Sequence, residues 1–340
     1  MIFKQKTTAS LLALIFFGVT SNALDQECQD PVLVLSNRIL TDDALPNKFR
    51  TMQDRVHKEK GVDFSTAGLK RMKVSASSEV TPKNLPNVIA ALHKKSAQKI
   101  TVIDLRRESH SWINGLPYYW LSSPDHLFNF CVDCYNNGKT VTQIEKDEMR
   151  RAAKLMDSCY AIVFDFSQGQ YPFVPTATAK TIAIEHAVLT EKDLVMLAGL
   201  EYLRLPISDD HAPSWSVIDQ LVNYYLSHPN NWLHVHCNEG RGRTTTILAM
   251  LDMLYNAKTV DFNSIILRQK LIGAGGADLF NVNAEESGIH DEFVYRLELL
   301  KNFYRYCKEN TDNFNTPFSV WASQHGLNEH RVSRCDIMRV

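Results

Sequence analysis

The sequence predicts an α/β fold, in which a mixed sheet is flanked by helices and carries a small inserted β-rich subdomain. Short apolar runs of high β-propensity alternate with longer stretches of helical character, which is typical of a sheet with helices packed on it. The 340 residues, of which 44% are hydrophobic and 22% charged, suit one large globular domain. We assign that domain to residues 24–340.

The elements follow in chain order. Strands are predicted at residues 99–105, 160–166, 202–207 and 232–236. Helices are predicted at residues 87–95, 142–156, 216–226, 244–255 and 291–309. Between about residues 115 and 200 the pattern loosens into short β-like runs and turns such as Asn136-Asn137-Gly138, and this stretch predicts the inserted subdomain.

The first 23 residues predict a secretory signal peptide. Lys4 and Lys6 precede an apolar stretch at residues 9–19, and the small residues Ser21 and Ala23 precede the expected cleavage point. The alternative is a buried N-terminal strand or helix. The apolar stretch is too short to span a bilayer comfortably, so we expect export to a periplasm, the medium or a host cell without stable membrane insertion.

The net charge and the cysteines restrict the classes of function and site that we expect. A formal net charge of −1 argues against nucleic-acid binding through a broad basic face, so a polyanion must meet a local basic pocket. Cys131 and Cys134 form a lone CxxC without a second ligand pair at zinc spacing, which favours a local disulfide or two structural thiols over a metal site. If one of the seven cysteines is a nucleophile, six remain available for disulfides.

The segment from His236 to Thr244 carries the chemistry. Cys237 and Arg243 are separated by five residues between an apolar strand and an apolar helix. Gly240 and Gly242 allow the loop to curl its N–H groups around one phosphate, and the following helix directs its positive end to the same point. The environment favours a Cys237 thiolate, Arg243 can hold two phosphoryl oxygens, and the Thr244 hydroxyl can stabilise the departing thiolate. The alternative is a buried cysteine in an ordinary strand-to-helix turn.

A proton donor for the leaving group is expected upstream. Asp210 is the candidate general acid, on a loop that also holds Asp209 as the alternative. His211 is either solvated or a phosphate ligand. His234 and His236 alternate along the strand before Cys237 and are expected to be hydrogen-bonded scaffold, with His236 tuning the environment of the thiolate.

Several segments together resemble the protein-tyrosine-phosphatase-like inositol polyphosphatases, the bacterial cysteine phytases. The similarity spans about residues 45–325 and includes residues 47–51, 104–110, 114–115, 210–211, 236–244, 303–306 and 316–321. The resemblance implies a tyrosine-phosphatase core with a small partial β-barrel, no metal cofactor, and stepwise removal of phosphates from myo-inositol hexakisphosphate.

The resemblance also implies roles for individual residues. Cys237 would be the nucleophile, Arg243 the phosphate chelator and Asp210 the general acid. Substrate contacts would come from the phosphate loop, Asn238, Glu239, Gly240, Arg241 and Gly242, and from Arg50, His211 and Arg296. Family loops commonly carry one acid directly after the cysteine, whereas here Asn238 comes first and Glu239 second. Arg241 makes this loop more basic.

Further cations are expected around the loop from the sequence itself. Arg106, Arg107 and His110 are candidates, although one of the two arginines is expected to pair with Glu108 or another core acid. The main rival function is a protein-tyrosine or phosphoinositide phosphatase with the same loop. A second rival is a non-catalytic effector that binds inositol phosphates, against which intact Cys237, Arg243 and Asp210 argue.

Overall fold

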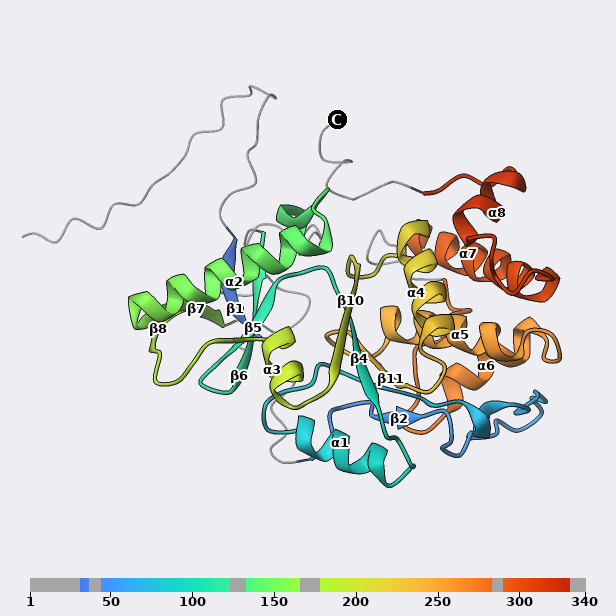
Figure 1. The fold of residues 1–340 in the computed structure, drawn as a ribbon, viewed down its shortest axis with the longest axis horizontal. Coiled ribbons are helices and arrows are strands. Elements are labelled where there is room, and N and C mark those ends of the chain that lie inside the picture. Colours follow the sequence, from blue (N-terminus) through green and yellow to red (C-terminus); the bar gives the residue numbers. More distant parts are fainter. Residues whose placement is uncertain (1–30, 37–43, 123–132, 166–177, 283–289, 331–340) are drawn as a thin grey trace, which may run out of the picture.

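The computed structural model describes residues 31–36, 44–122, 133–165, 178–282 and 290–330, which contain two sheets with helices around them (Figure 1). The larger lobe is built on a five-stranded sheet of order β10-β4-β11-β3-β2. Its strands are β10 (Glu201–Ile207), β4 (Ile100–Arg106), β11 (Trp232–His236), β3 (Val74–Ser77) and β2 (Arg50–Thr51). The first four strands run parallel and β2 is antiparallel to β3.

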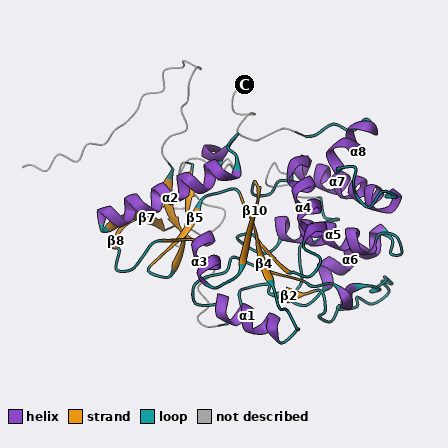
Figure 2. Cartoon of the chain, viewed as in Figure 1, coloured by secondary structure: helices purple, strands orange, loops and turns teal. Residues whose placement is uncertain are grey.

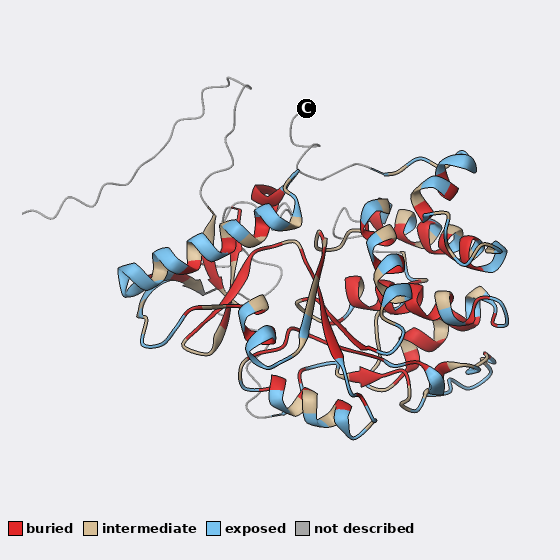
Figure 3. Cartoon of the chain, viewed as in Figure 1, coloured by how far each residue is buried: buried red, intermediate tan, exposed pale blue. Residues whose placement is uncertain are grey.

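Helices cover both faces of this sheet (Figure 2). One face packs against α4 (Trp215–Ser227), α5 (Gly242–Asn256), α6 (Phe262–Leu271), α7 (His290–Glu309) and α8 (Phe318–Gln324). The other face packs against α1 (Leu85–His93) and α3 (Glu191–Leu197). Because β4 and β11 are covered on both sides, every residue in them is buried (Figure 3), including the polar residues Asp104, Arg106, His234 and His236.

The second sheet has the order β8-β7-β1-β6-β5-β9. Its strands are β8 (Thr178–Ala183), β7 (Tyr160–Asp165), β1 (Val32–Leu35), β6 (Leu116–Leu121), β5 (His110–Ile113) and β9 (Leu189–Thr190), and α2 (Val141–Ser158) packs on one face. Asn114 and Gly115, with φ of 53° and 79°, turn β5 back into β6, which is the hairpin that an Asn-Gly pair favours. Short 3₁₀ helices lie at Leu69–Arg71 and Cys134–Asn136.

The predicted fold class is confirmed, and so are the predicted strands and helices within a few residues of their ends. Helices α3, α6 and α8 were not predicted. The second sheet takes β1 and β5 from outside the expected insertion at 115–200, and its closure into a partial barrel stays a prediction. The expected signal peptide lies outside the described residues. None of the helices in the described ranges is long and apolar enough to cross a membrane.

Candidate active site

The loop between β11 and α5 curls as its glycines predict. Gly240 has a φ of 72°, and a Cβ atom there would lie 2.5 Å from the backbone carbonyl of Ser77 on the neighbouring strand. The loop is held from behind, because the Glu79 N–H donates to the Asn238 carbonyl (3.2 Å) and Arg50 Nη1 donates to the Gly240 carbonyl (3.1 Å). Only glycine fits this position without displacing the backbone.

Helix α5 begins differently from several other helices of the chain. Four helices have a side chain that accepts a backbone N–H in the first turn: Thr140 for α2, Thr190 for α3, Ser214 for α4 and Asp261 for α6. Arg241, at the start of α5, provides no such side-chain cap. The first N–H groups of α5 are therefore available to an anion. Thr244 Oγ1, in the same turn, is buried and has no hydrogen-bond partner among the described residues.

Cys237 and Arg243 are both buried at the base of this loop, with Cys237 3% exposed. Glu108, just after β4, binds Arg243 through both carboxylate oxygens, at 2.7 Å from Nη1 and 3.0 Å from Nη2. Its Oε1 also accepts from Arg106 Nε at 2.8 Å. Burial opposes a charged carboxylate, but Arg243 and Arg106 outweigh it and hold the pKa of Glu108 far below its usual range. Arg243 is thus fixed in one orientation.

The expected acid loop lies beside Arg243. Asp209 Oδ1 is 2.9 Å from Arg243 Nη2, while the carboxylate of Asp210 makes no ion pair within the described part of the chain. Asp210 has a φ of 59°, and its carbonyl accepts from Arg296 Nη2. The His211 ring is oriented through Nδ1, 2.6 Å from the Asp209 carbonyl, with Nε2 3.7 Å from Glu292. The structure therefore brings both candidate acids to the phosphate loop.

The predicted substrate-binding residues divide by exposure. Arg241 is exposed, whereas Asn238, Glu239, Gly242 and His211 are half-buried around the loop. Arg50 and Arg296 are buried and donate to backbone carbonyls, of the phosphate loop and of the acid loop respectively. Both arginines thus hold the loops in place, and direct phosphate contact from them stays a prediction.

Two other expected cations do not face the loop opening. Arg106 is buried between Glu79 and Glu108, which confirms that one arginine of the pair serves the core. Arg107 pairs with Asp133 at 2.7 Å, and His110 is fully buried. The expectation of ligand contact from Arg106 and His110 is wrong in this structure, because both side chains are buried and pair with buried acids, Arg106 with Glu79 and Glu108 and His110 with Glu191.

Glu191 was not predicted from the sequence, yet it contacts the residue next to Cys237. Its Oε1 is 2.5 Å from His236 Nε2, and its Oε2 is 2.7 Å from His110 Nε2. Burial disfavours charged histidine, but Glu191 outweighs it and raises the pKa of His236 to about 9. His234 has no such partner. Burial and the neighbouring His236 lower its pKa to about 3, and its ring nitrogens lie 2.9 and 3.1 Å from Ser75 and Ser77 hydroxyls.

Asp104, His110 and Glu191 could in principle hold a metal ion, since their ligand atoms lie within 4.8 Å of one another and all are buried. Asp104, however, accepts from the Tyr202 hydroxyl at 2.8 Å and lies 3.3 Å from Arg204 Nε. Glu191 is shared by two histidines. Since both carboxylates already face protein cations, we interpret this cluster as an ion-pair network that joins the two sheets.

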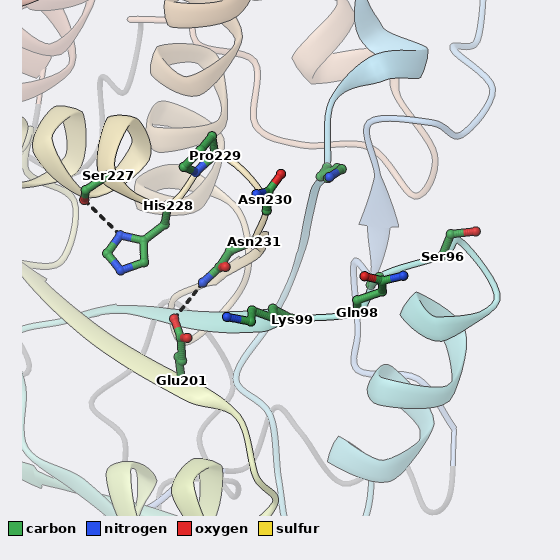
Figure 4. A pocket seen from close by; sticks show the side chains of 11 residues that line it. Ser96, Gln98, Lys99, Glu201, Ser227, His228, Pro229, Asn230 and Asn231 are labelled. Carbon is green, nitrogen blue, oxygen red and sulfur yellow. Dashed lines mark hydrogen bonds between the residues drawn. The ribbon is translucent and has the colours of Figure 1, made fainter.

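A pocket of about 760 Å³ lies at the opposite end of the parallel strands (Figure 4). Its lining includes Lys73, Lys99, Glu201, His228 and Asn231. Its buried polar group, the Asn231 amide, donates to Thr101 and Glu201, and His228 stacks on Tyr224 at 4.0 Å. Because these polar groups satisfy one another, we assign the pocket no chemistry.

Four of the seven cysteines lie in the described residues, and the expected pairing of Cys131 with Cys134 stays a prediction. Cys134 is disulfide-bonded, with its partner outside the described residues, whereas Cys159 and Cys307 are free thiols like Cys237. Thus the six cysteines other than Cys237 do not all form disulfides. Cys28, Cys131 and Cys335 lie outside the described residues.

Comparison with known proteins agrees with this geometry. The family model for protein-tyrosine-phosphatase-like phytases, described by the words inositol hexakisphosphate, matches residues 103–255. The myo-inositol phosphatase of this type from Mitsuokella multacida, solved with myo-inositol-(1,3,4,5)-tetrakisphosphate, is 30% identical over 92% of this chain, with a TM-score of 0.76. Residues 103–255 therefore match the protein-tyrosine-phosphatase-like phytase family, and the chain has the fold of the Mitsuokella enzyme.

Other relatives extend the comparison. A phytase of this type from Bdellovibrio bacteriovorus shares the fold, with a TM-score of 0.58 and 24% identity, over 87% of this chain and 96% of that one. The effector protein hopD2 of Pseudomonas syringae pv. tomato is 26% identical over 92% of this chain. This phytase-like chain spans 64% of hopD2 and 50% of the Mitsuokella chain, so it corresponds to part of each.

Proposed function

We propose that this chain hydrolyses phosphomonoesters of inositol polyphosphates through a phosphocysteine intermediate. The observation that carries the proposal is the loop itself: Cys237 precedes a loop that turns at Gly240, α5 begins at the end of this loop without a side-chain cap, and Glu108 fixes the guanidinium of Arg243. A nucleophile, N–H donors and a rigid cation converging on one point are what phosphoryl transfer requires.

In the first step the Cys237 thiolate attacks phosphorus while the bond from phosphorus to the inositol oxygen breaks. Asp210 is the proposed donor of the proton to that leaving oxygen, because its carboxylate makes no ion pair within the described residues, whereas Asp209 pairs with Arg243. Arg243 and the N–H groups of α5 stabilise the charge on the three equatorial phosphoryl oxygens. Glu108 contributes by preventing Arg243 from rotating away.

In the second step a water molecule attacks the phosphocysteine. Asp210, now a carboxylate, takes the proton from that water, phosphate forms, and the sulfur leaves as the Cys237 thiolate. The buried, unpartnered hydroxyl of Thr244 is available to donate to this thiolate. The positive charge on His236, which Glu191 maintains, lies one residue away in sequence and favours the same anionic state.

The substrate class is supported by the family and by the rim of the loop. Arg241 is exposed and His211 half-buried, so both can meet additional phosphates on a small ring. The Mitsuokella relative binds an inositol tetrakisphosphate. A phosphotyrosine or phosphoinositide substrate would use the same chemistry, and the experiment below separates the three.

We also propose that the protein is exported. The leader-like residues 1–23, the disulfide at Cys134 and the similarity to an effector protein support this. Mass analysis of the exported form should find a chain that begins after Ala23. A full-length chain confined to the cytoplasm would contradict the proposal.

The test of the activity is phosphate release from myo-inositol hexakisphosphate, a phosphotyrosine peptide and a phosphoinositide vesicle, for wild type and Cys237→Ser. We expect the soluble inositol phosphate to be the best substrate and the Ser variant to be inactive on all three. Preference for the peptide or the vesicle would overturn the substrate class, whereas full activity of the variant would overturn the mechanism.

A further inference from the structure

The guanidinium of Arg243 presents two edges to its surroundings. Glu108 occupies the edge formed by Nη1 and Nη2, and Nη1 also donates to the Ile207 carbonyl at 3.0 Å. Five N–H groups are available on a guanidinium, so the remaining edge consists of Nε–H and the second N–H of Nη2. Because Glu108 blocks the first edge, a phosphoryl group held by two bonds to Arg243 must use the second.

Asp209 forms an ion pair with Arg243 next to that second edge. Its Oδ1 lies 2.9 Å from Nη2, while Nε has no partner among the described residues although it is buried. The Arg243 side chain is 1% exposed, whereas that of Asp209 is 43% exposed. The Asp209 carboxylate therefore approaches the guanidinium from the solvent side. A buried N–H without a hydrogen-bond partner is energetically unfavourable. Here the unpartnered Nε–H of Arg243 lies next to Nη2, which Asp209 contacts through one carboxylate oxygen.

We propose that Asp209 is a latch: its carboxylate lies against Nη2 of Arg243, beside the phosphate-binding edge, and moves away when phosphate enters. The inference rests on the proposed function, because it assumes that the phosphoryl group binds in the loop of Cys237. The carboxylate engages Nη2 alone, whereas a phosphoryl group can supply separate oxygens to Nε and Nη2. A phosphate monoester therefore displaces the latch more readily than an anion that offers one oxygen.

The backbone around Asp209 is anchored on both sides, so the latch opens by side-chain movement. Ser208 Oγ donates to Asp133 at 2.8 Å, and Arg296 holds the Asp210 carbonyl. The Asp209 carbonyl itself lies 2.6 Å from His211 Nδ1. Rotation of the Asp209 side chain frees Nη2 without moving Asp210, which remains in position as the proposed acid.

The test measures binding of inorganic phosphate by calorimetry in the Cys237→Ser background, where no phosphocysteine can form. The latch reduces the fraction of molecules able to bind, so Asp209→Asn should bind phosphate about three- to tenfold more tightly than its parent, and Asp209→Ala at least as tightly. Glu298→Gln is the control for loss of one negative charge, since Glu298 is exposed on α7, pairs with Lys301 and has no part in the proposed site.

The outcomes separate the latch from the proposed function. Equal phosphate affinity in the parent and both Asp209 variants would overturn the latch and leave the phosphate loop intact. An equal gain in Asp209→Asn and Glu298→Gln would also overturn it, because the effect would then come from net charge alone. Absence of phosphate binding in every variant would overturn the proposed function together with the latch. A crystal structure of the parent with phosphate gives an independent check that does not depend on the Asp209 variants: Asp209 should have left Nη2 while Glu108 remains, and an Asp209 still at Nη2 would contradict the latch.

Discussion

His236 Nε2 lies 2.5 Å from Glu191 Oε1, and this contact ties the strand that delivers Cys237 to a helix outside the phosphate loop. The second oxygen of Glu191 reaches His110 on β5, in the other sheet, at 2.7 Å. One carboxylate thus links both sheets to the residue that precedes the nucleophile. The position of Cys237 therefore depends on packing between the two lobes as well as on its own loop.

The first prediction concerns the pH dependence of stability. The pKa of His236 is raised to about 9 in the folded protein, above its ordinary value of 6.5, so its protonation stabilises the fold fully below pH 6.5. This contribution is lost as pH rises from 6.5 through 9. Urea unfolding should therefore show a loss of about 1–3 kcal/mol across that interval. In His236→Asn the loss of stability between pH 6.5 and 9 should be smaller than in the wild type. The same loss in both proteins would show that His236 is not the group responsible.

Glu191→Gln should lower the pKa of His236 and destabilise the protein by about 3 kcal/mol, because it leaves two buried histidines without their anion. NMR titration of the histidine ring protons measures the first effect and urea unfolding the second. Glu298→Gln, which removes an exposed partner of Lys301, is the control and should cost about 0–1 kcal/mol. A similar small cost for both variants would contradict the role of Glu191.

Gly240→Ala should abolish phosphate binding, since its Cβ atom would meet the Ser77 carbonyl at 2.5 Å and force the loop to open. Gly115→Ala is the matched control, because Gly115 also has a positive φ but has nothing within 4 Å of the added atom. The control should lose about 1–3 kcal/mol of stability from backbone strain alone and keep its phosphate affinity. Calorimetry with inorganic phosphate distinguishes the two, and equal affinities would show that close approach at Gly240 is not needed.

Asp210→Asn should lower kcat on myo-inositol hexakisphosphate by about 10²–10⁴-fold, since the inositol alkoxide needs a proton as it leaves. On p-nitrophenyl phosphate, whose leaving group is a weak base, formation of the phosphocysteine should be much less affected. Asp209→Asn should not show this dependence on the leaving group. If Asp209→Asn shows it instead, the general acid is Asp209 and the assignment is reversed.

Glu108→Gln should reduce the transition-state stabilisation that Arg243 provides. With the charge gone, Arg243 and Arg106 lose the anion that fixes them, so we expect a fall in kcat and about 3 kcal/mol lower stability. Steady-state kinetics and urea unfolding measure the two effects. Wild-type kcat in a folded Glu108→Gln enzyme would show that the orientation of Arg243 does not depend on Glu108.

The strands and helices of the larger lobe were predictable because they follow simple periodicity. The run at β4 is rich in β-branched and apolar residues, and α5 starts directly after a recognisable loop. The second sheet was harder, since β1 and β5 pair with strands distant in sequence, and a two-residue strand such as β9 has no pattern of its own. The Asn114-Gly115 pair was the available sign of the β5–β6 hairpin.

The candidate site was predictable only where residues are adjacent in sequence. Cys237, Gly240 and Arg243 lie in one segment, and the structure keeps them together. Glu191 comes from a helix in a different part of the chain, and no local pattern distinguishes it from a surface acid at the start of a helix. The roles of Arg50 and Arg296 in holding carbonyls depend on burial, which periodicity does not reveal for a single arginine.

The central claim is that Cys237 carries the phosphoryl group during turnover. Rapid quenching of the wild-type enzyme with myo-inositol hexakisphosphate, followed by mass analysis of the peptide that contains Cys237, tests it most directly. We predict one phosphoryl group on Cys237 within the first turnover and none in Cys237→Ser. Continued phosphate release without a phosphorylated Cys237 peptide would contradict the account.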